Sequence, residues 1–171
     1  MKLFIYKLFF FFLILGITEA TANTQLIDIN YVVNNSKIGK SLNNIIDSKN
    51  KNITSELNKL KKKLEDKKEK IVSQKNILKE DEFKKLVNNY EIEVKQFNEI
   101  RKNKTKDFNT FRINSKKKIL DVLNPLIKDF LENKSITILL QKDNILFGNK
   151  ELDITNEILK ILDEKHKTMK F

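Results

Sequence analysis

The residues that could carry out catalysis are few and scattered along the chain. The sequence of 171 residues contains one histidine, His166, and no cysteine. A lone histidine near the end of a predicted helix is typical of a solvated residue favoured by the helix dipole, not of a metal ligand or a general base. Asp28, Asp143 and Asp153 lie beside predicted strands, turns and a helix start, where carboxylates usually have structural roles. We therefore expect no catalytic residue, no metal site and no cofactor.

The first 22 residues have the three parts of a secretory signal peptide. Lys2 and Lys7 precede an apolar run over residues 8–17, and small residues follow at Ala20 and Ala22. The run is half as long as the roughly twenty residues that a membrane-spanning helix needs. We predict cleavage after Ala22 and export from the cytoplasm, with an uncleaved membrane anchor as the alternative. Without cysteine, the exported protein has to be stabilised by packing or by association.

The middle of the chain is predicted to be helical. Residues 40–124 contain neither glycine nor proline. Apolar residues recur there at intervals of three and four, which is typical of a coiled-coil seam. The first series is Ile46, Ile53, Leu57, Leu60, Leu64, Ile71 and Leu78, and the second is Phe83, Leu86, Tyr90, Val94, Phe97, Phe108, Phe111, Ile119, Val122, Leu126 and Phe130.

The two apolar series are separated by the polar residues 79–82, and Asp81 is predicted to cap the second helix. We predict an antiparallel hairpin of two arms, each roughly 60 Å long; a single helix of roughly 120 Å is the alternative. Four polar residues occupy seam positions and should leave the packing in the middle of the arm thin: Lys67, Gln74, Arg101 and Lys104.

The ends of the chain are predicted to contain short strands. Residues 25–30 and 135–140 are rich in β-branched residues, and residues 142–144 should turn into a third strand over 145–147 that forms a hairpin with the second. Thr155 is predicted to cap a final helix. The predicted fold class is therefore α+β, with a small β-rich oligomerisation body from residues 23–36 and 131–171 and a helical hairpin arm over residues 37–130, its tip near 79–82.

The predicted body is too small to be stable alone. Three short strands and one helix bury little apolar surface, so we expect copies of the chain to complete the sheet by association. The residues expected to form this oligomerisation body are Ile27, Ile29, Ile136, Ile138, Leu140, Leu146 and Ile154.

The positive charge is concentrated in the arm. Residues 49–79 contain eleven basic and four acidic residues, and residues 80–120 contain eleven basic and seven acidic residues. The positive electrostatic field of such a segment attracts acidic polypeptides and anionic membrane surfaces. Nucleic acid is the usual partner of such charge, but export makes it an improbable partner here, and we expect no nucleic-acid binding.

Several segments resemble the Skp (OmpH-like) family of periplasmic chaperones. They are Asp28-Ile29-Asn30, the following residues 32–40, the charged helical hairpin, Ile136-Thr137-Ile138-Leu139-Leu140, Asn144-Ile145-Leu146-Phe147 and Leu152-Asp153-Ile154-Thr155. The resemblance implies a homotrimer with a central barrel-like body and three projecting hairpins around a cavity. It also implies ATP-independent capture of unfolded outer-membrane proteins in the periplasm. For the lipopolysaccharide site proposed in the family, no residue can be matched.

The arm is the predicted site of client binding. The candidate residues are Phe83, Tyr90, Phe97, Phe108, Phe111, Lys61, Lys62, Lys63, Arg101 and Lys102, and seam packing is the alternative role of the aromatic ones. The expected partners are unfolded outer-membrane proteins and further copies of the chain, with anionic lipid or lipopolysaccharide as a further partner. The alternative function is a structural or tethering coiled coil of the envelope that binds one folded partner or an anionic surface.

Overall fold

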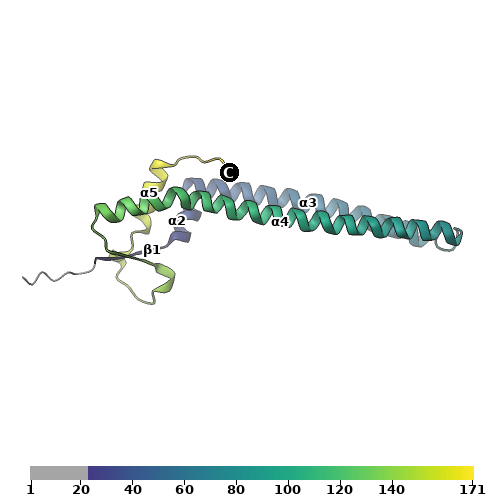
Figure 1. Cartoon of the computed structure of the whole chain (residues 1–171), viewed down its shortest axis with the longest axis horizontal. Coiled ribbons are helices and arrows are strands. Elements are labelled where there is room, and N and C mark those ends of the chain that lie inside the picture. Colours follow the sequence, from purple (N-terminus) through teal and green to yellow (C-terminus); the bar gives the residue numbers. More distant parts are fainter. Residues whose placement is uncertain (1–22) are drawn as a thin grey trace, which may run out of the picture.

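The computed structural model describes residues 23–171, so the predicted signal peptide with its cleavage site lies outside the described residues. A long two-helix arm extends from a small body (Figure 1). The elements, in chain order, are β1 (Thr24–Ile27), α2 (Ile29–Asn35), α3 (Lys37–Gln74), α4 (Glu80–Asn133), β2 (Ile138–Gln141), the 3₁₀ helices η1 (Lys142–Asn144) and η2 (Lys150–Leu152), and α5 (Thr155–Lys165). Within the described part of the chain, no helix combines the length and the apolar character that crossing a membrane requires.

The arm is an antiparallel pair of α3 and α4, which confirms the predicted hairpin. Every residue of the two predicted apolar series is buried or half-buried. Leu78 lies in the turn at the tip, and the spacing keeps the other side chains on the facing sides of the two helices. The tip lies at residues 75–79, just before the predicted position. Asp81 is not the helix cap: Lys79 occupies that position without a side-chain cap, and Asp81 lies in the first turn, where its charge suits the helix dipole.

The core of the body lies where α2, α5 and the base of the arm meet. Twelve buried apolar residues form it: Ile27, Val32, Val33, Ile38, Leu42, Ile119, Leu123, Leu126, Ile127, Ile154, Ile158 and Leu162. The base of the arm is therefore fixed to the body by burial of apolar side chains, the largest favourable contribution to folding.

The sheet of the body has two parallel strands, one from each end region. Thr24 of β1 pairs with Ile138 of β2, and Leu26 pairs with Leu140. Parallel strands require a long crossover connection, and the whole helical arm provides it here. The prediction of a third strand over 145–147 that forms a hairpin with β2 is wrong. Residues 145–147 pair with no other strand in the described chain, and the sheet consists of β1 and β2.

The predicted first strand was too long at its C-terminal end. β1 ends at Ile27, and Asp28 caps the short helix α2 by accepting a hydrogen bond of 2.7 Å from the Tyr31 N–H. Ile29 is consequently helical and not part of the sheet. The hydroxyl of Ser36 caps α3 by accepting a hydrogen bond of 3.0 Å from the Gly39 N–H. These two caps turn the chain sharply from the sheet into the arm.

A glycine is required at the turn between α2 and α3. A Cβ atom on Gly39 would lie 1.7 Å from the carbonyl oxygen of Val33, which is far inside van der Waals contact. The close approach of the two helices therefore depends on the absence of a side chain at this position.

Candidate functional site

The acidic residues near the strands fix the body and form no reaction centre. The carboxylate of Asp153 accepts hydrogen bonds from the Thr155 N–H at 3.0 Å and from the Lys142 ammonium group at 2.6 Å. The hydroxyl of Thr155 donates to Asp153 and accepts from the Asp28 N–H at 2.9 Å. Thr155 is thus the first residue of α5 and not its cap, which is Ile154. This network ties α5 to the sheet.

The environment of Asp153 favours its charged form. Burial opposes ionisation, since its side chain is only 19% exposed, but the hydrogen bonds from Lys142 and Thr155 outweigh this effect and lower the pKa of Asp153. The same contact raises the pKa of Lys142. The ion pair between Lys142 and Asp153 contributes to both shifts and closes the loop after β2.

The remaining residues of possible catalytic interest are dispersed. Asp143 contacts Gln141, and His166 lies at the C-terminal cap of α5. Over residues 23–171, no group of three or more histidine, cysteine or acidic residues is arranged to hold a metal ion.

The residues predicted for the oligomerisation body separate into two groups. Ile27 and Ile154 are buried in the core of the single chain, and Ile29 and Ile136 are half-buried. The exposed group consists of Ile138, Leu140 and Leu146.

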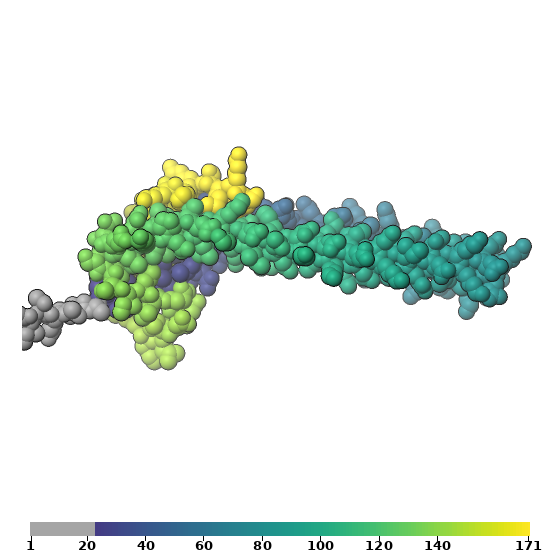
Figure 2. Space-filling model, in the orientation of Figure 1, coloured from purple at the N-terminus to yellow at the C-terminus, as the bar shows by residue number. Residues whose placement is uncertain are grey.

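The exposed group has a further member that the predicted residue list lacked. Phe147 is 95% exposed and follows Leu146, which is 92% exposed. Its place in the apolar run over 145–147 was the signal that pointed to it. We call Ile138, Leu140, Leu146 and Phe147 the apolar patch. The loop that carries Leu146 and Phe147 protrudes from the body (Figure 2).

The open edge of the sheet belongs to the same part of the body. β1 lies between β2 and a single bridge that joins Leu26 to Asp153. Within the described residues, β2 therefore has a hydrogen-bonded neighbour on one edge only. An open edge next to exposed apolar side chains is a surface at which another strand can pair.

The predicted client-binding residues are all on the arm but differ in their environment. Phe83, Tyr90, Phe97, Phe108 and Phe111 are half-buried along the seam, whereas the basic candidates are exposed: Lys61, Lys62, Lys63, Arg101 and Lys102. Two aromatic rings are covered by cations, since the Lys49 ammonium group lies 4.7 Å from the ring centre of Phe111 and the Arg112 guanidinium 5.8 Å from that of Phe108.

Two of the four polar seam residues join the helices. Lys67 forms an ion pair with Glu93 at 2.5 Å, and Lys104 forms one with Glu56 at 2.9 Å. Gln74 and Arg101 point to solvent. The sequence indicated an interrupted seam but did not reveal that cross-helix ion pairs fill two of the interruptions.

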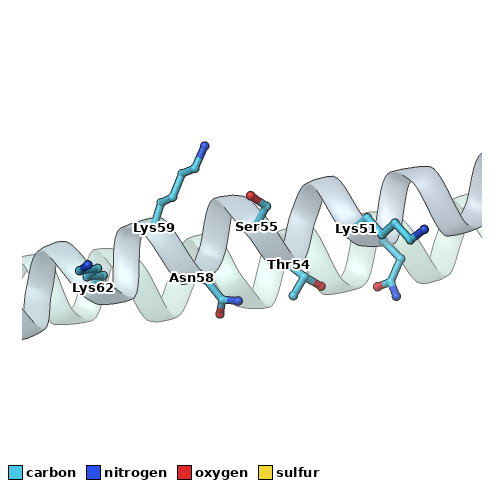
Figure 3. Close-up of a pocket in the computed structure, with 7 residues that line it drawn as sticks. Lys51, Thr54, Ser55, Asn58, Lys59 and Lys62 are labelled. Atoms are coloured by element: carbon cyan, nitrogen blue, oxygen red, sulfur yellow. The ribbon is translucent and has the colours of Figure 1, made fainter.

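The outer face of α3 is polar and basic. A broad, open hollow of about 670 Å³ is lined by residues of this helix alone: Asn50, Lys51, Thr54, Ser55, Asn58, Lys59 and Lys62. Their side chains do not converge, since Lys59 and Asn58 point in opposite directions (Figure 3). This face presents positive charge over a surface and lacks the enclosed geometry of a small-molecule site.

The fold combines a basic helical arm with a small body. Residues 24–162 match the family model described as outer membrane protein (OmpH-like), so the chain belongs to the OmpH-like family. This is a family of chaperones and not of enzymes. None of the curated proteins matches the chain significantly.

A solved structure has the same fold. It is the crystal structure of a protein from Caulobacter crescentus CB15, described as an OmpH-like outer membrane chaperone. The two structures superpose with a TM-score of 0.79 over 89% of this chain and 90% of that one, at 16% sequence identity. At this identity the likeness concerns the fold alone.

Proposed function

We propose that this protein is an ATP-independent periplasmic chaperone that holds unfolded outer-membrane proteins and prevents their aggregation during transit. The observation that carries the proposal is the arm itself, which projects from the body (Figure 2). It combines exposed basic residues with half-buried aromatic residues. Membership of the OmpH-like family supports it. The predicted signal peptide, cleaved after Ala22, accounts for delivery to the periplasm.

The proposed mechanism needs no nucleotide. Positive charge draws an unfolded polypeptide toward the arm, and many weak apolar contacts then hold it. A client that folds into the membrane withdraws its exposed apolar surface, and the contacts are lost. Retention therefore ends when folding succeeds.

We further propose that the body associates into a homotrimer. The apolar patch and the open edge of β2 support association, because exposed apolar side chains and unpaired backbone groups are both satisfied by a neighbouring copy. The outer edge of β2 lacks a partner strand in one chain. A strand of a second copy would supply that partner. The number three comes from the resemblance to the Skp family.

The experiment that tests the holding function uses the signal-free protein and an outer-membrane barrel protein unfolded in urea. The client is diluted into buffer with and without the chaperone, while turbidity reports aggregation and light scattering reports the mass of any complex. We expect a soluble complex of defined mass that weakens as salt is added. A stable oligomer that leaves the client to aggregate would refute the proposal.

A matched pair of variants tests whether client binding depends on the charge of the arm or only on the total charge of the protein. Lys61→Gln/Lys62→Gln/Lys63→Gln removes three exposed charges from the arm, and Lys160→Gln/Lys165→Gln/Lys167→Gln removes three exposed charges from the body. We expect the arm variant to bind the client several-fold more weakly at low salt, and the body variant to bind like the wild type. Equal losses would show that the location of the charge is irrelevant.

The second candidate function is a tethering coiled coil that binds an anionic surface. The open basic face of α3 favours it, since such a face binds anionic lipid without an enclosed site. Sedimentation with vesicles of anionic phospholipid or with lipopolysaccharide tests this function. Tight vesicle binding together with unprotected client would select the tether over the chaperone.

A further inference from the structure

Two hollows with both apolar and polar walls lie along the arm, and both helices line each of them. The distal hollow, nearer the tip, has a volume of about 180 Å³ and is lined by Leu60, Lys63, Leu64, Glu93, Gln96, Phe97 and Ile100. The basal hollow, nearer the body, has a volume of about 380 Å³ and is lined by Lys49, Asn52, Ile53, Lys104, Asp107, Phe108 and Phe111. Three of the predicted client-binding aromatic residues are therefore on these walls.

The two hollows open on the same flank of the hairpin. At about 100° per residue, the side chains at 52, 56, 63 and 67 of α3 fall on one side of the seam, and those at 93, 100, 104 and 111 of α4 fall on the side that faces them. The ion pairs agree with this placement: Glu56 pairs with Lys104 of the basal hollow, and Lys67 pairs with Glu93 of the distal hollow. We call this surface, with both hollows, the flank groove.

The spacing of the hollows is within reach of an extended polypeptide. Corresponding wall residues, such as Ile53 and Leu64, are eleven residues apart in α3, which corresponds to about 16–17 Å along the helix axis, and each wall extends over about 6 Å of that helix. In an extended chain, alternate side chains share a face, and residues i and i+4 on that face are about 13–14 Å apart. Two apolar side chains four residues apart can therefore enter both hollows at once.

The chemistry of the hollows selects bulky apolar side chains. The smaller hollow, of about 180 Å³, is open to solvent and has Leu60, Phe97 and Ile100 in its wall, so a bulky apolar side chain can enter it. Ile100 remains 38% exposed at its wall and can be covered by a ligand. Lys63 lies at the wall of the distal hollow, and Lys49, whose ammonium group covers the ring of Phe111, lies at that of the basal hollow; neither takes part in an ion pair between described residues. Acidic residues of a ligand would find partners there.

We propose that the flank groove binds extended, amphipathic segments of unfolded polypeptide, with bulky apolar side chains at positions i and i+4 in the two hollows and acidic neighbours against Lys49 and Lys63. Segments of this pattern are those that form β-strands with one apolar face. The inference rests on the proposed holding function and adds to it a binding register along the arm.

The test uses labelled peptides of about twelve residues in extended-forming sequences, with two phenylalanines and two acidic residues. One peptide has the phenylalanines at i and i+4, and the other has the same composition with the phenylalanines at i and i+3, which point to opposite faces. Fluorescence anisotropy with the whole signal-free protein measures affinity. We expect the i, i+4 peptide to bind about tenfold more tightly, because that is the gain in affinity from partly burying one more apolar side chain.

Two matched variants locate the binding surface. Ile100→Glu places a charge in the wall of the distal hollow, whereas Ile113→Glu places the same charge on the same helix at a residue that is 68% exposed and lines neither hollow. We expect the first variant to weaken binding of the i, i+4 peptide about tenfold and the second to change it less than twofold. Circular dichroism checks the helices, and Ile100→Asn replaces the first variant if Ile100→Glu unfolds the arm.

The outcomes separate this inference from the proposed function. If the wild-type protein keeps the unfolded client soluble but shows no preference between the two peptides, or if both glutamate variants weaken binding equally, the flank groove is not the binding surface and the holding function stands. If the wild-type protein leaves the client to aggregate, the holding function fails. A tenfold preference that Ile100→Glu abolishes and Ile113→Glu preserves would establish the groove.

Discussion

Phe147 offers the sharpest test of association through the body. The side chain is 95% exposed in the single chain, so replacing it with alanine removes almost no contact from the folded monomer. If Phe147 is buried between copies, each copy loses about 1.5–3 kcal/mol of apolar burial, because that is the value of fully burying such a side chain. In a trimer the loss occurs three times and amounts to roughly 4.5–9 kcal/mol, an upper estimate.

This loss translates into a large change of the dissociation midpoint. The midpoint concentration of a monomer–trimer equilibrium varies with the square root of the equilibrium constant, so we expect it to rise by about two to three orders of magnitude. Sedimentation over a dilution series of Phe147→Ala measures this midpoint. Ile113→Ala, at an exposed position on the arm, is the control that should leave it unchanged.

The reasoning would be refuted by either of two results. A Phe147→Ala protein that dissociates at the wild-type concentration would show that the apolar patch is not in the interface. A variant whose monomer loses helix content by circular dichroism would show that Phe147 contributes to the fold of the single chain, contrary to its exposure.

Three further predictions follow from contacts within the chain. Gly39→Ala should lower the free energy of unfolding by about 1–3 kcal/mol in urea titrations, because the new methyl group would collide with the carbonyl oxygen of Val33; unchanged stability would contradict the tight turn. Asp153→Asn should lower the free energy of unfolding by about 1 kcal/mol at pH 7. Because folding lowers the pKa of Asp153, the carboxylate stabilises the protein fully above its ordinary pKa of about 4, and this stabilisation disappears as the pH falls through the lower pKa of the folded state. Thermal melts of wild type and variant should therefore converge in strong acid. A double-mutant cycle with Lys67→Ala and Glu93→Ala should give a coupling of about 0.2–1 kcal/mol that shrinks in high salt, and a coupling independent of salt would contradict an exposed ion pair.

The arm was the part of the fold that the sequence predicted best. Coiled-coil periodicity is a local property, and a seam such as that from Ile46 to Leu78 specifies both helix and buried face within a few turns. The turn lies at residues 75–79, just before the polar residues 79–82 from which it was predicted. The predicted cap residue was wrong because Asp81 lies in the first turn of the helix, where the helix dipole also favours an acidic residue.

The body was predicted less well because its elements depend on distant partners. The run from Leu26 to Asn30 looks like one strand, but Asp28 caps a helix. Asp28 itself, a residue type favoured at helix N-caps, was the signal that the β-branched composition concealed. Parallel pairing of β1 with β2 joins residues more than a hundred positions apart, which no local pattern indicates. The segment 145–147 has the composition of a strand but no partner within the chain.

The candidate surfaces were predicted in composition and not in arrangement. Charge counts indicated a basic arm, and the aromatic residues were identified on it. Their grouping was not predictable, because whether Phe97 and Phe108 line hollows on one flank depends on the pairing register of α3 and α4. The ion pairs of Lys67 and Lys104 depend on the same register.

The parallel pairing of β1 and β2 has a consequence for the order of folding. The strands are separated by a chain of more than a hundred residues, and closing such a loop from a random coil is entropically costly and slow. The hairpin forms from contacts that begin locally at its tip, and once formed it brings the start of α3 and the end of α4 to the body (Figure 1). We expect the arm to form first and the sheet last. A break near the base of the arm should then slow assembly of the body more than a break near the tip.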